Sequence, residues 1–239
     1  MTPPHETPVI RAEGLTRIYT TGSGAVAGLT AIDLHVAPAE LVVLKGDSGS
    51  GKSTLLSLLA GLDAPTAGRL TVAGYDLEGA APARLTEYRR SVVGMVFQTF
   101  NLLPTLSVLE NVCLPALLAG KPAAGVREKA RDLLEWLGMT PRLAHFPAQL
   151  SGGEMQRTAI ARALINDPPV ILADEPTGNL DSDNSAAVID LLARLNRQEG
   201  RTIVIATHSD IADAVATRRI RLKDGRMVDP PRPGMAGPL

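Results

Sequence analysis

The most informative motif in this chain of 239 residues is Gly46-Asp47-Ser48-Gly49-Ser50-Gly51-Lys52-Ser53-Thr54. It stands between the apolar runs 41–44 and 55–60, so the sequence predicts a buried strand, a tight loop and a helix. In that context G-x-x-x-x-G-K-[ST] predicts a phosphate site, because the glycines let successive backbone N–H groups point at one anion at a helix N-terminus. Lys52 would reach the β- and γ-phosphates, and the Ser53 hydroxyl would hold Mg²⁺. A chance glycine-rich turn is the alternative, and the flanking strand and helix argue against it.

Composition and charge exclude several classes of protein. The formal net charge is −1, so the chain lacks the basic footprint of a nucleic-acid binder, and no nucleic-acid partner is expected. The single cysteine, Cys113, excludes an internal disulfide and a cysteine-based metal site, and we expect it to be buried. The apolar stretches are too interrupted to span a bilayer, and the N-terminus lacks the features of a signal peptide. We therefore expect a cytoplasmic chain whose membrane role, if any, comes through a partner.

Strand and helix patterns alternate along the chain and predict an α/β core with a mainly parallel sheet, into which a helical segment is inserted. Half-buried strands are expected at Val9–Tyr19 and Ala31–Val36, and continuous apolar strands at Val170–Ala173 and Thr202–Ala206. The other expected elements are strands at Arg69–Ala73 and Val93–Phe97, helices at Pro82–Arg90, Pro122–Leu137, Met155–Asn166 and Asn184–Gln198, a short helix from about Asp210, and a terminal hairpin turning at Asp224-Gly225.

Local patterns also predict two helix starts in the inserted segment and a loose tail at each end. Ser107 and Glu110 have the spacing of a capping box, and Thr140-Pro141 has the pattern of an N-cap followed by proline. Residues 1–8 and 229–239 are rich in Pro and Gly and are expected to be flexible tails.

Two adjacent acids, Asp174 and Glu175, follow the apolar strand at 170–173. In a parallel sheet, ligands bind beyond the carboxyl ends of the strands, where the loop after residue 44 also opens. Asp174 suits the Mg²⁺ coordination sphere through water, and Glu175 suits polarisation of an attacking water. The alternative is a pair of helix-capping acids favoured by the helix dipole. Beside a phosphate loop, the catalytic interpretation is the stronger one.

A second candidate anion site begins at Ser151. Ser151 is a good N-cap for the helix that follows, and Glu154 completes the capping-box spacing, so the stretch could be only a well-capped helix. However, Gly152 and Gly153 each weaken a helix by about 1 kcal/mol relative to Ala. They are explained if the backbone must approach something closely, such as an anion contacted by the Ser151 hydroxyl and the glycine N–H groups.

Three further motifs stand in the order in which they occur in the ATP-binding subunit of ABC transporters, and with them the chain resembles that family. Gln98 follows the strand 93–97, the run ADEPTGNLDS (173–182) contains the acid pair and Asp181, and Thr207-His208 closes an apolar strand. The resemblance covers an ABC-type ATP-binding domain at residues 9–228. It implies a P-loop NTPase core with an antiparallel β subdomain and an α-helical subdomain at about 99–166. It also implies ATP and Mg²⁺ as cofactors, and a homodimer.

In that homodimer each ATP would lie between the phosphate loop of one subunit and the Ser151–Glu154 stretch of the other. The resemblance assigns Gln98 to Mg²⁺ or the attacking water, His208 to the γ-phosphate and to Glu175, and Asp181 to the dimer interface. Tyr19 matches the position whose ring stacks on adenine, and a core tyrosine at a strand end is the alternative. Glu154 departs from the family, where Gln is commonest: it preserves the capping interaction but adds negative charge near a triphosphate.

A narrower resemblance comes from FQTFNLLPTLSVLENV (97–112), which looks like the subfamily serving lipoprotein release, macrolide or peptide export, and cell division. It implies an integral membrane permease as partner. Phe100, Asn101, Leu102 and Leu103 would line the groove that receives a cytoplasmic helix of that permease, unless they only pack the helical subdomain.

The predicted function is therefore an ATP-hydrolysing subunit, peripheral on the inner face of the cell membrane, that energises export, lipoprotein release or mechanotransmission. Three alternatives remain: a regulator that closes on ATP without moving a substrate, an ABC-type protein acting on nucleic acid or ribosomes, and a small-molecule kinase built on the same phosphate loop.

Overall fold

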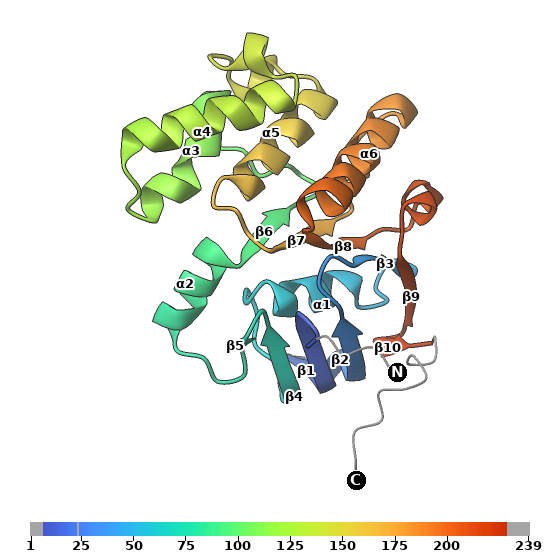
Figure 1. Cartoon of the computed structure of the whole chain (residues 1–239). Coiled ribbons are helices and arrows are strands. Elements are labelled where there is room, and N and C mark those ends of the chain that lie inside the picture. Colours follow the sequence, from blue (N-terminus) through green and yellow to red (C-terminus); the bar gives the residue numbers. More distant parts are fainter. Residues whose placement is uncertain (1–6, 23, 229–239) are drawn as a thin grey trace, which may run out of the picture.

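The structure is a computed structural model that describes residues 7–22 and 24–228 (Figure 1). Its central layer is a six-stranded sheet in the order β10-β9-β3-β8-β7-β6. The strands are β3 (Leu41–Lys45), β6 (Val93–Val96), β7 (Val170–Asp174), β8 (Thr202–Ala206), β9 (Arg218–Lys223) and β10 (Arg226–Met227). All neighbours are parallel except β9 and β10, which form the predicted hairpin with positive φ at Asp224 and Gly225. The predicted α/β class is confirmed. Residues 1–6 and 229–239 of the expected tails lie outside the described residues.

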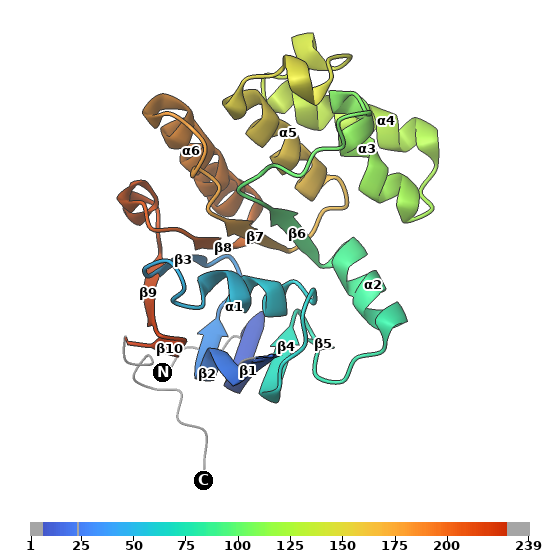
Figure 2. The same cartoon turned by 180° about the vertical axis from the view of Figure 1, so that it is seen from behind.

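A second, antiparallel sheet lies on one side of this layer. It has four strands in the order β2-β1-β4-β5: β1 (Ile10–Thr21), β2 (Gly24–Val36), β4 (Ala67–Val72) and β5 (Tyr75–Asp76). Helix α1 (Lys52–Leu59) lies between the two sheets (Figures 1 and 2). Its buried leucines share one apolar cluster with residues of both sheets, so the helix that follows the phosphate loop is fixed from both sides.

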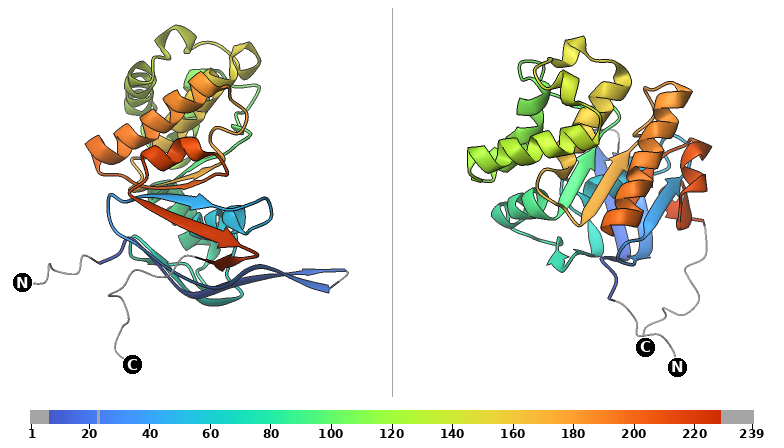
Figure 3. Two further views of the ribbon diagram at one scale, coloured as in Figure 1. Left: turned by 90° about the vertical axis from the view of Figure 1, so that its right-hand side faces the viewer. Right: turned by 45° about the horizontal axis from the view of Figure 1, so that its top comes forward.

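Helices cover the opposite side of the central sheet (Figure 3). They are α3 (Val108–Leu118), α4 (Ala123–Trp136), α5 (Gly152–Leu164) and α6 (Ser182–Glu199), while α2 (Pro82–Ser91) leads into β6. Residues 7–22 and 24–228 also contain three short 3₁₀ helices: η1 (Thr140–Arg142), η2 (Pro147–Gln149) and η3 (Asp210–Ala214). None of the helices in the described part of the chain is long and apolar enough to cross a membrane.

The continuous apolar runs are explained by burial on both faces of the central sheet. In β3, Leu41 and Val43 pack into the cluster under the helices, whereas Val42 and Leu44 pack into the cluster around α1. Cys113 of α3 is buried in the helical cluster, as expected.

The two predicted helix starts in the inserted segment have different outcomes. The capping box at Ser107 is confirmed, since its hydroxyl accepts from the Glu110 N–H and the Glu110 carboxylate accepts from the Ser107 N–H. The N-cap at Thr140 is wrong: Thr140 lies inside the three-residue helix η1, whose N-cap is Met139. A longer helix is disfavoured here because Pro147 has no N–H to donate to the Leu143 carbonyl, and the carbonyls of Leu143 and His145 accept hydrogen bonds from the first turn of α3.

Strand β2 begins at Gly24, seven residues before the predicted start at Ala31. Residues 24–27 are exposed, because the β1–β2 hairpin extends beyond the body of the molecule (Figure 3). They therefore carry no alternation of burial from which a strand could be predicted.

Candidate active site

The phosphate loop connects β3 to α1 and depends on its glycines. Gly46 has φ 153° and Gly51 has φ 103°, values that residues other than glycine rarely adopt. A Cβ atom on Gly46 would lie 2.4 Å from the Leu222 carbonyl oxygen, and one on Gly51 would lie 2.7 Å from the Gly28 carbonyl oxygen. The loop is thus wedged between β9 and β2, and only glycine fits at these two positions.

Lys52 lies inside the loop, 7% exposed, where its ammonium donates to the carbonyl oxygens of Gly46 at 2.7 Å and Asp47 at 3.1 Å. The buried hydroxyl oxygen of Ser50 has no hydrogen-bond partner among the described residues. Buried polar atoms are normally paired, so an unpaired hydroxyl in the same loop as a fixed ammonium suits a loop that binds an anion.

A groove of about 770 Å³ runs along the loop. Its lining comes from six segments: β1, β2, the phosphate loop, and the ends of β6, β7 and β8. They bring together Tyr19, residues 26–28, residues 47–54, Gln98, Glu175 and His208. The groove opens at the carboxyl ends of the parallel strands, as expected for a ligand site in such a sheet. Of the residues predicted to bind or act on the nucleotide within one subunit, only Gly46 and Asp174 are outside this lining, and both adjoin it.

The acid pair does not cap a helix, because α6 begins after an N-cap at Asp181. Asp174 accepts a hydrogen bond from the Ser53 hydroxyl at 3.1 Å, and burial raises the pKa of Asp174. Glu175 has φ 45°, and one of its carboxylate oxygens lies 3.0 Å from Nδ1 of His208. The other carboxylate oxygen is buried with no hydrogen-bond partner among the described residues. A carboxylate with one oxygen held and one free is arranged to take a proton from a water.

The oxygen atoms of Ser53 and Asp174 fit a magnesium ion. Mg²⁺ prefers oxygen ligands, and beside a phosphate it is commonly held by one or two protein groups and by water. Gln98, the third predicted ligand, lines the same groove, and the side-chain amide of Asn179 donates to the backbone carbonyl oxygen of Gln98 at 3.0 Å. Its side-chain amide lies against Gly178, where a Cβ atom would come within 2.7 Å of Nε2.

Tyr19 is a half-exposed wall of the groove and not a core residue. Its hydroxyl donates to Asp63 at 2.9 Å, and the Arg17 guanidinium lies 4.5 Å from the centre of its ring. A Cβ atom on Gly28 would lie 2.7 Å from the ring, so that glycine leaves the space the ring occupies. The sequence predicted Tyr19 but not its partners Arg17 and Asp63. Asp63 is 46 residues from Arg17 and 44 from Tyr19 in the sequence, and no periodic pattern links such pairs.

Ser151, Gly152, Gly153 and Glu154 stand apart from the groove, at the start of α5, and none of them is among its described lining residues. The predicted capping box is present, with the Ser151 N–H donating to Glu154 at 2.8 Å. Arg142 also binds Glu154, at 2.7 Å. Hydrogen bonds from Arg142 and from the Ser151 backbone lower the pKa of Glu154 to about 2. Arg142 was not predicted, because it lies 12 residues before Glu154 and no motif or helix spacing links the two positions.

One of the two glycines has an explanation within the chain itself. A Cβ atom on Gly153 would lie 2.1 Å from Oδ1 of Asn184. Asn184 is held in place by Asp181, which caps α6 and accepts from both the backbone N–H and the side-chain amide of Asn184. Close packing of α5 on α6 therefore requires Gly153 even without a ligand. Asp181 is exposed beside this contact, so it is available to a second molecule.

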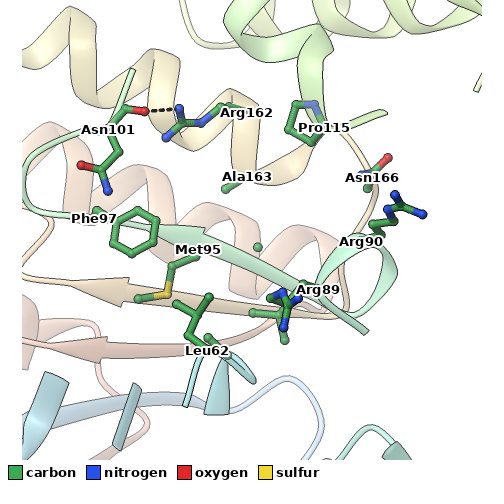
Figure 4. A pocket seen from close by; sticks show the side chains of 13 residues that line it. Leu62, Arg89, Arg90, Met95, Phe97, Asn101, Pro115, Arg162, Ala163 and Asn166 are labelled. Carbon is green, nitrogen blue, oxygen red and sulfur yellow. Dashed lines mark hydrogen bonds between the residues drawn. The ribbon is translucent and has the colours of Figure 1, made fainter. Parts of the chain in front are cut away.

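A separate groove of about 330 Å³ lies between β6, α2 and α5 (Figure 4). Leu62, Met95 and Phe97 form its apolar part, and Arg89, Arg90 and Arg162 surround it, whereas no Asp or Glu is among its described lining residues. Of the four residues predicted to line a partner groove, Asn101 lines this groove. Phe100, Leu102 and Leu103 do not, because the chain turns at Phe100 and Asn101, which both have positive φ, and Arg162 holds the two carbonyl oxygens of this turn.

Known proteins resemble this chain in sequence and in structure. The family model described as ABC transporter matches residues 29–178. An uncharacterized ABC transporter ATP-binding protein of Mycobacterium tuberculosis is 46% identical over 221 residues, 92% of this chain and 89% of that protein. The macrolide export ATP-binding/permease protein MacB 1/2 of Paracoccus denitrificans is 47% identical over 227 residues, 95% of this chain and 34% of that protein. This chain thus spans about a third of the length of that permease-fused relative.

Among solved structures, the ATP-binding cassette MJ0796, in a dimeric post-hydrolysis state bound to ADP and Pi, matches with a TM-score of 0.86 and 38% identity. The match covers 92% of this chain and 97% of that one. Because the family model matches more than half of the chain and the fold agrees, the chain belongs to the ABC transporter family and is an ATP-binding domain of that family.

Proposed function

We propose that this chain is the ATP-hydrolysing subunit of an export-type ABC complex, and that it works on the inner face of the cell membrane on a permease partner. The observation that carries the proposal is the groove, which gathers Tyr19, the phosphate loop, Gln98, Glu175 and His208 and leaves Ser151–Glu154 outside. A site assembled from one edge of the sheet has the groups to bind and orient a triphosphate, and a second copy would supply the Ser151–Glu154 stretch that the groove lacks.

Two copies would complete the site. Ser151 and the N–H groups of Gly152 and Gly153 would approach the γ-phosphate bound to the other copy, where a helix N-terminus stabilises negative charge. Arg142 neutralises Glu154, so the acid in this stretch adds little repulsion toward a phosphate. Asp181, exposed at the start of α6, would contact the second copy in the same closure. The dimeric cassette with ADP and Pi, at 38% identity, supports this arrangement.

Within the site, each side chain has a separate task. Lys52 and the loop amides would bind the phosphates, and Tyr19 would stack on adenine. The free oxygen of Glu175 would orient the attacking water and take its proton, while His208 holds the other oxygen. Magnesium, when bound at Ser53 and Asp174, would supply charge neutralisation at the phosphates. Positioning and electrostatic stabilisation account for most of the catalysis of phosphoryl transfer.

The apolar groove surrounded by arginines supports a permease partner (Figure 4). A cytoplasmic helix with apolar residues and an acidic side chain would complement both the apolar part and the three arginines. The relatives named macrolide export ATP-binding/permease protein, about a third of whose length this chain matches, also support a permease partner.

Co-purification separates the main alternatives. A polytopic membrane protein recovered with this chain supports transport or a regulator that closes on ATP without moving a substrate. RNA or ribosomes would favour the nucleic-acid class, which the net charge of −1 does not suggest. A small-molecule kinase would leave the Ser151–Glu154 stretch and His208 without a role.

The test of the proposed function is Glu175→Gln, which keeps the shape of the side chain and removes its basicity. The variant should bind ATP with magnesium, lose about 10²–10⁴-fold in turnover, and accumulate as a dimer in size-exclusion chromatography with ATP. Glu128→Gln, at an exposed position of α4, is the matched control and should keep wild-type turnover. Wild-type turnover in Glu175→Gln would remove Glu175 from the catalytic role.

A further inference from the structure

Lys45 is a nearly buried charge that the proposed mechanism does not use. It is the last residue of β3 and directly precedes the phosphate loop. Its side chain is 15% exposed, and its ammonium contacts three oxygen atoms: the Ser209 carbonyl at 2.6 Å, an Asp210 carboxylate oxygen at 2.8 Å and an Asp213 carboxylate oxygen at 3.1 Å. Burying a charged lysine costs folding free energy unless nearby oxygen atoms pair with it, because burial disfavours the charged form.

These contacts hold the backbone on one side of His208, and β3 also holds the other side. The Thr207 N–H, just before His208, donates to the Leu44 carbonyl at 3.0 Å. The Ser209 carbonyl, just after it, accepts from Lys45. Two consecutive residues of β3 therefore anchor the two neighbours of His208, and the same strand runs directly into the phosphate loop.

The imidazole of His208 has little packing of its own to fix it. Its side chain is 71% exposed and reaches Glu175 at 3.0 Å. Its position relative to the loop is therefore set mainly by its backbone. The backbone on the C-terminal side continues into η3, whose acids Asp210 and Asp213 are both held by Lys45.

The two acids are not equivalent partners. Asp210 is almost fully exposed, and its bond to Lys45 lowers the pKa of Asp210. Asp213 is 25% exposed, so it would lose its ion-pair partner in a partly buried place if Lys45 were replaced. The expected response to loss of Lys45 is movement of η3 and of the Ser209 carbonyl away from β3.

We propose that Lys45 is a positioning residue for ATP hydrolysis: it fixes the backbone of His208 to the strand that carries the phosphate loop, and so sets the contact between His208 and Glu175. This inference rests on the proposed function, since it assumes that His208 and Glu175 act in hydrolysis. Lys45 would not touch the nucleotide, and its effect would pass through His208.

The experiment is a double-mutant cycle on the full chain with Lys45→Met, which keeps the length and removes the charge, and His208→Ala. Lys45→Met should lower kcat about tenfold while KM for ATP changes less than about threefold, because the loss falls on geometry that matters in the transition state. Lys45→Arg, which keeps the charge, should recover most of kcat. In the His208→Ala background, Lys45→Met should have no further effect, because the two residues act as one unit.

Several results would overturn the inference: unchanged kcat in Lys45→Met, a rise in KM with kcat unchanged, or an equal loss of kcat in both backgrounds. A merely structural ion pair would give the last of these, together with a lower unfolding midpoint. If His208→Ala itself kept wild-type turnover, the role of His208 in the proposed function would fail instead, so the two failures are distinguishable. Should Lys45→Met not fold, Asp213→Asn carries the same cycle, with a smaller expected loss of kcat that again disappears without His208.

Discussion

Two carboxylates predicted to lie near the nucleotide, Asp174 and Glu154, have pKa values shifted in opposite directions by their surroundings. Asp174 is desolvated beside Ser53, and its raised pKa reflects a carboxylate that a cation would stabilise. Glu154 is bound by Arg142 and by the Ser151 N–H, which keeps it ionised at any physiological pH. The first carboxylate is the one that we propose binds a magnesium ion with the nucleotide. The second is already neutralised within the chain, which removes the main objection to an acid at the start of α5.

The Arg142–Glu154 pair gives a pH-dependent prediction. Arg142→Gln should lower the free energy of unfolding at pH 7 by about 1 kcal/mol, the range for a partly exposed charged hydrogen bond. The pKa of Glu154 falls from an ordinary 4.5 to about 2 in the folded chain, so the stabilisation is present above pH 4.5 and is lost as the pH falls toward 2. Urea unfolding at a series of pH values should show the difference between wild type and variant shrinking over that window.

Glu154→Gln is the control for this prediction, because it keeps the capping acceptor and removes the charge. In the Glu154→Gln background, Arg142→Gln should cost little, and its effect should not change between pH 2 and pH 4.5. A constant difference across that window in the wild-type background would show that Arg142 acts through packing and not through Glu154.

Among the elements, those governed by local chemistry could be predicted from the sequence, and those governed by distant contacts could not. The helix starts at Ser107 and Ser151 were predictable because a capping box is satisfied within four residues. Thr140 failed because carbonyls after it bind the first turn of α3, which no local pattern reveals. The glycines of α5 were interpreted as an anion site, yet Gly153 is also required by Asn184, 31 residues away.

The packing of α5 on α6 predicts that the effect of Gly153→Ala on the free energy of unfolding depends on Asn184. Gly153→Ala should destabilise the chain by about 1–2 kcal/mol, because overpacking against Asn184 exceeds the gain in helix propensity. An Asn184→Ala background removes the two nearest atoms of Asn184 and leaves its Cβ at 3.3 Å, so Gly153→Ala should there be neutral or stabilise by up to about 1 kcal/mol. Thermal or urea unfolding of the four proteins measures both effects. Destabilisation of equal size in both backgrounds would mean that the clash is with another group.

On the scale of the whole molecule, the groove lies at the carboxyl ends of the central strands, whereas the Ser151–Glu154 stretch lies at the start of α5 and outside the groove. The groove gathers the ends of parallel strands, an arrangement that follows from topology and that the order of motifs made predictable. The bond from Lys45 to the Ser209 carbonyl, next to His208, was not predictable. It joins residues 164 positions apart, and Lys45 follows the apolar run 41–44 from which the strand was predicted. Of the four residues expected to line a groove for a permease helix, the groove between β6, α2 and α5 contains Asn101, and whether a partner binds there stays a prediction.

A site shared between copies makes a prediction that no single-chain site shares. Ser151→Arg should leave ATP binding by the monomer intact and abolish hydrolysis, and Lys52→Ala should abolish hydrolysis through the phosphate loop. In an equal mixture half the dimers are mixed, and each of these has one complete site, so turnover should return to about a quarter of wild type if the sites are independent. The matched control is the double variant Lys52→Ala/Ser151→Arg mixed with wild type, whose mixed dimers contain no complete site. Turnover that is additive in both mixtures, with no recovery in the first while mixed dimers are shown to form, would mean that each copy works alone and that the start of α5 serves only to pack against α6.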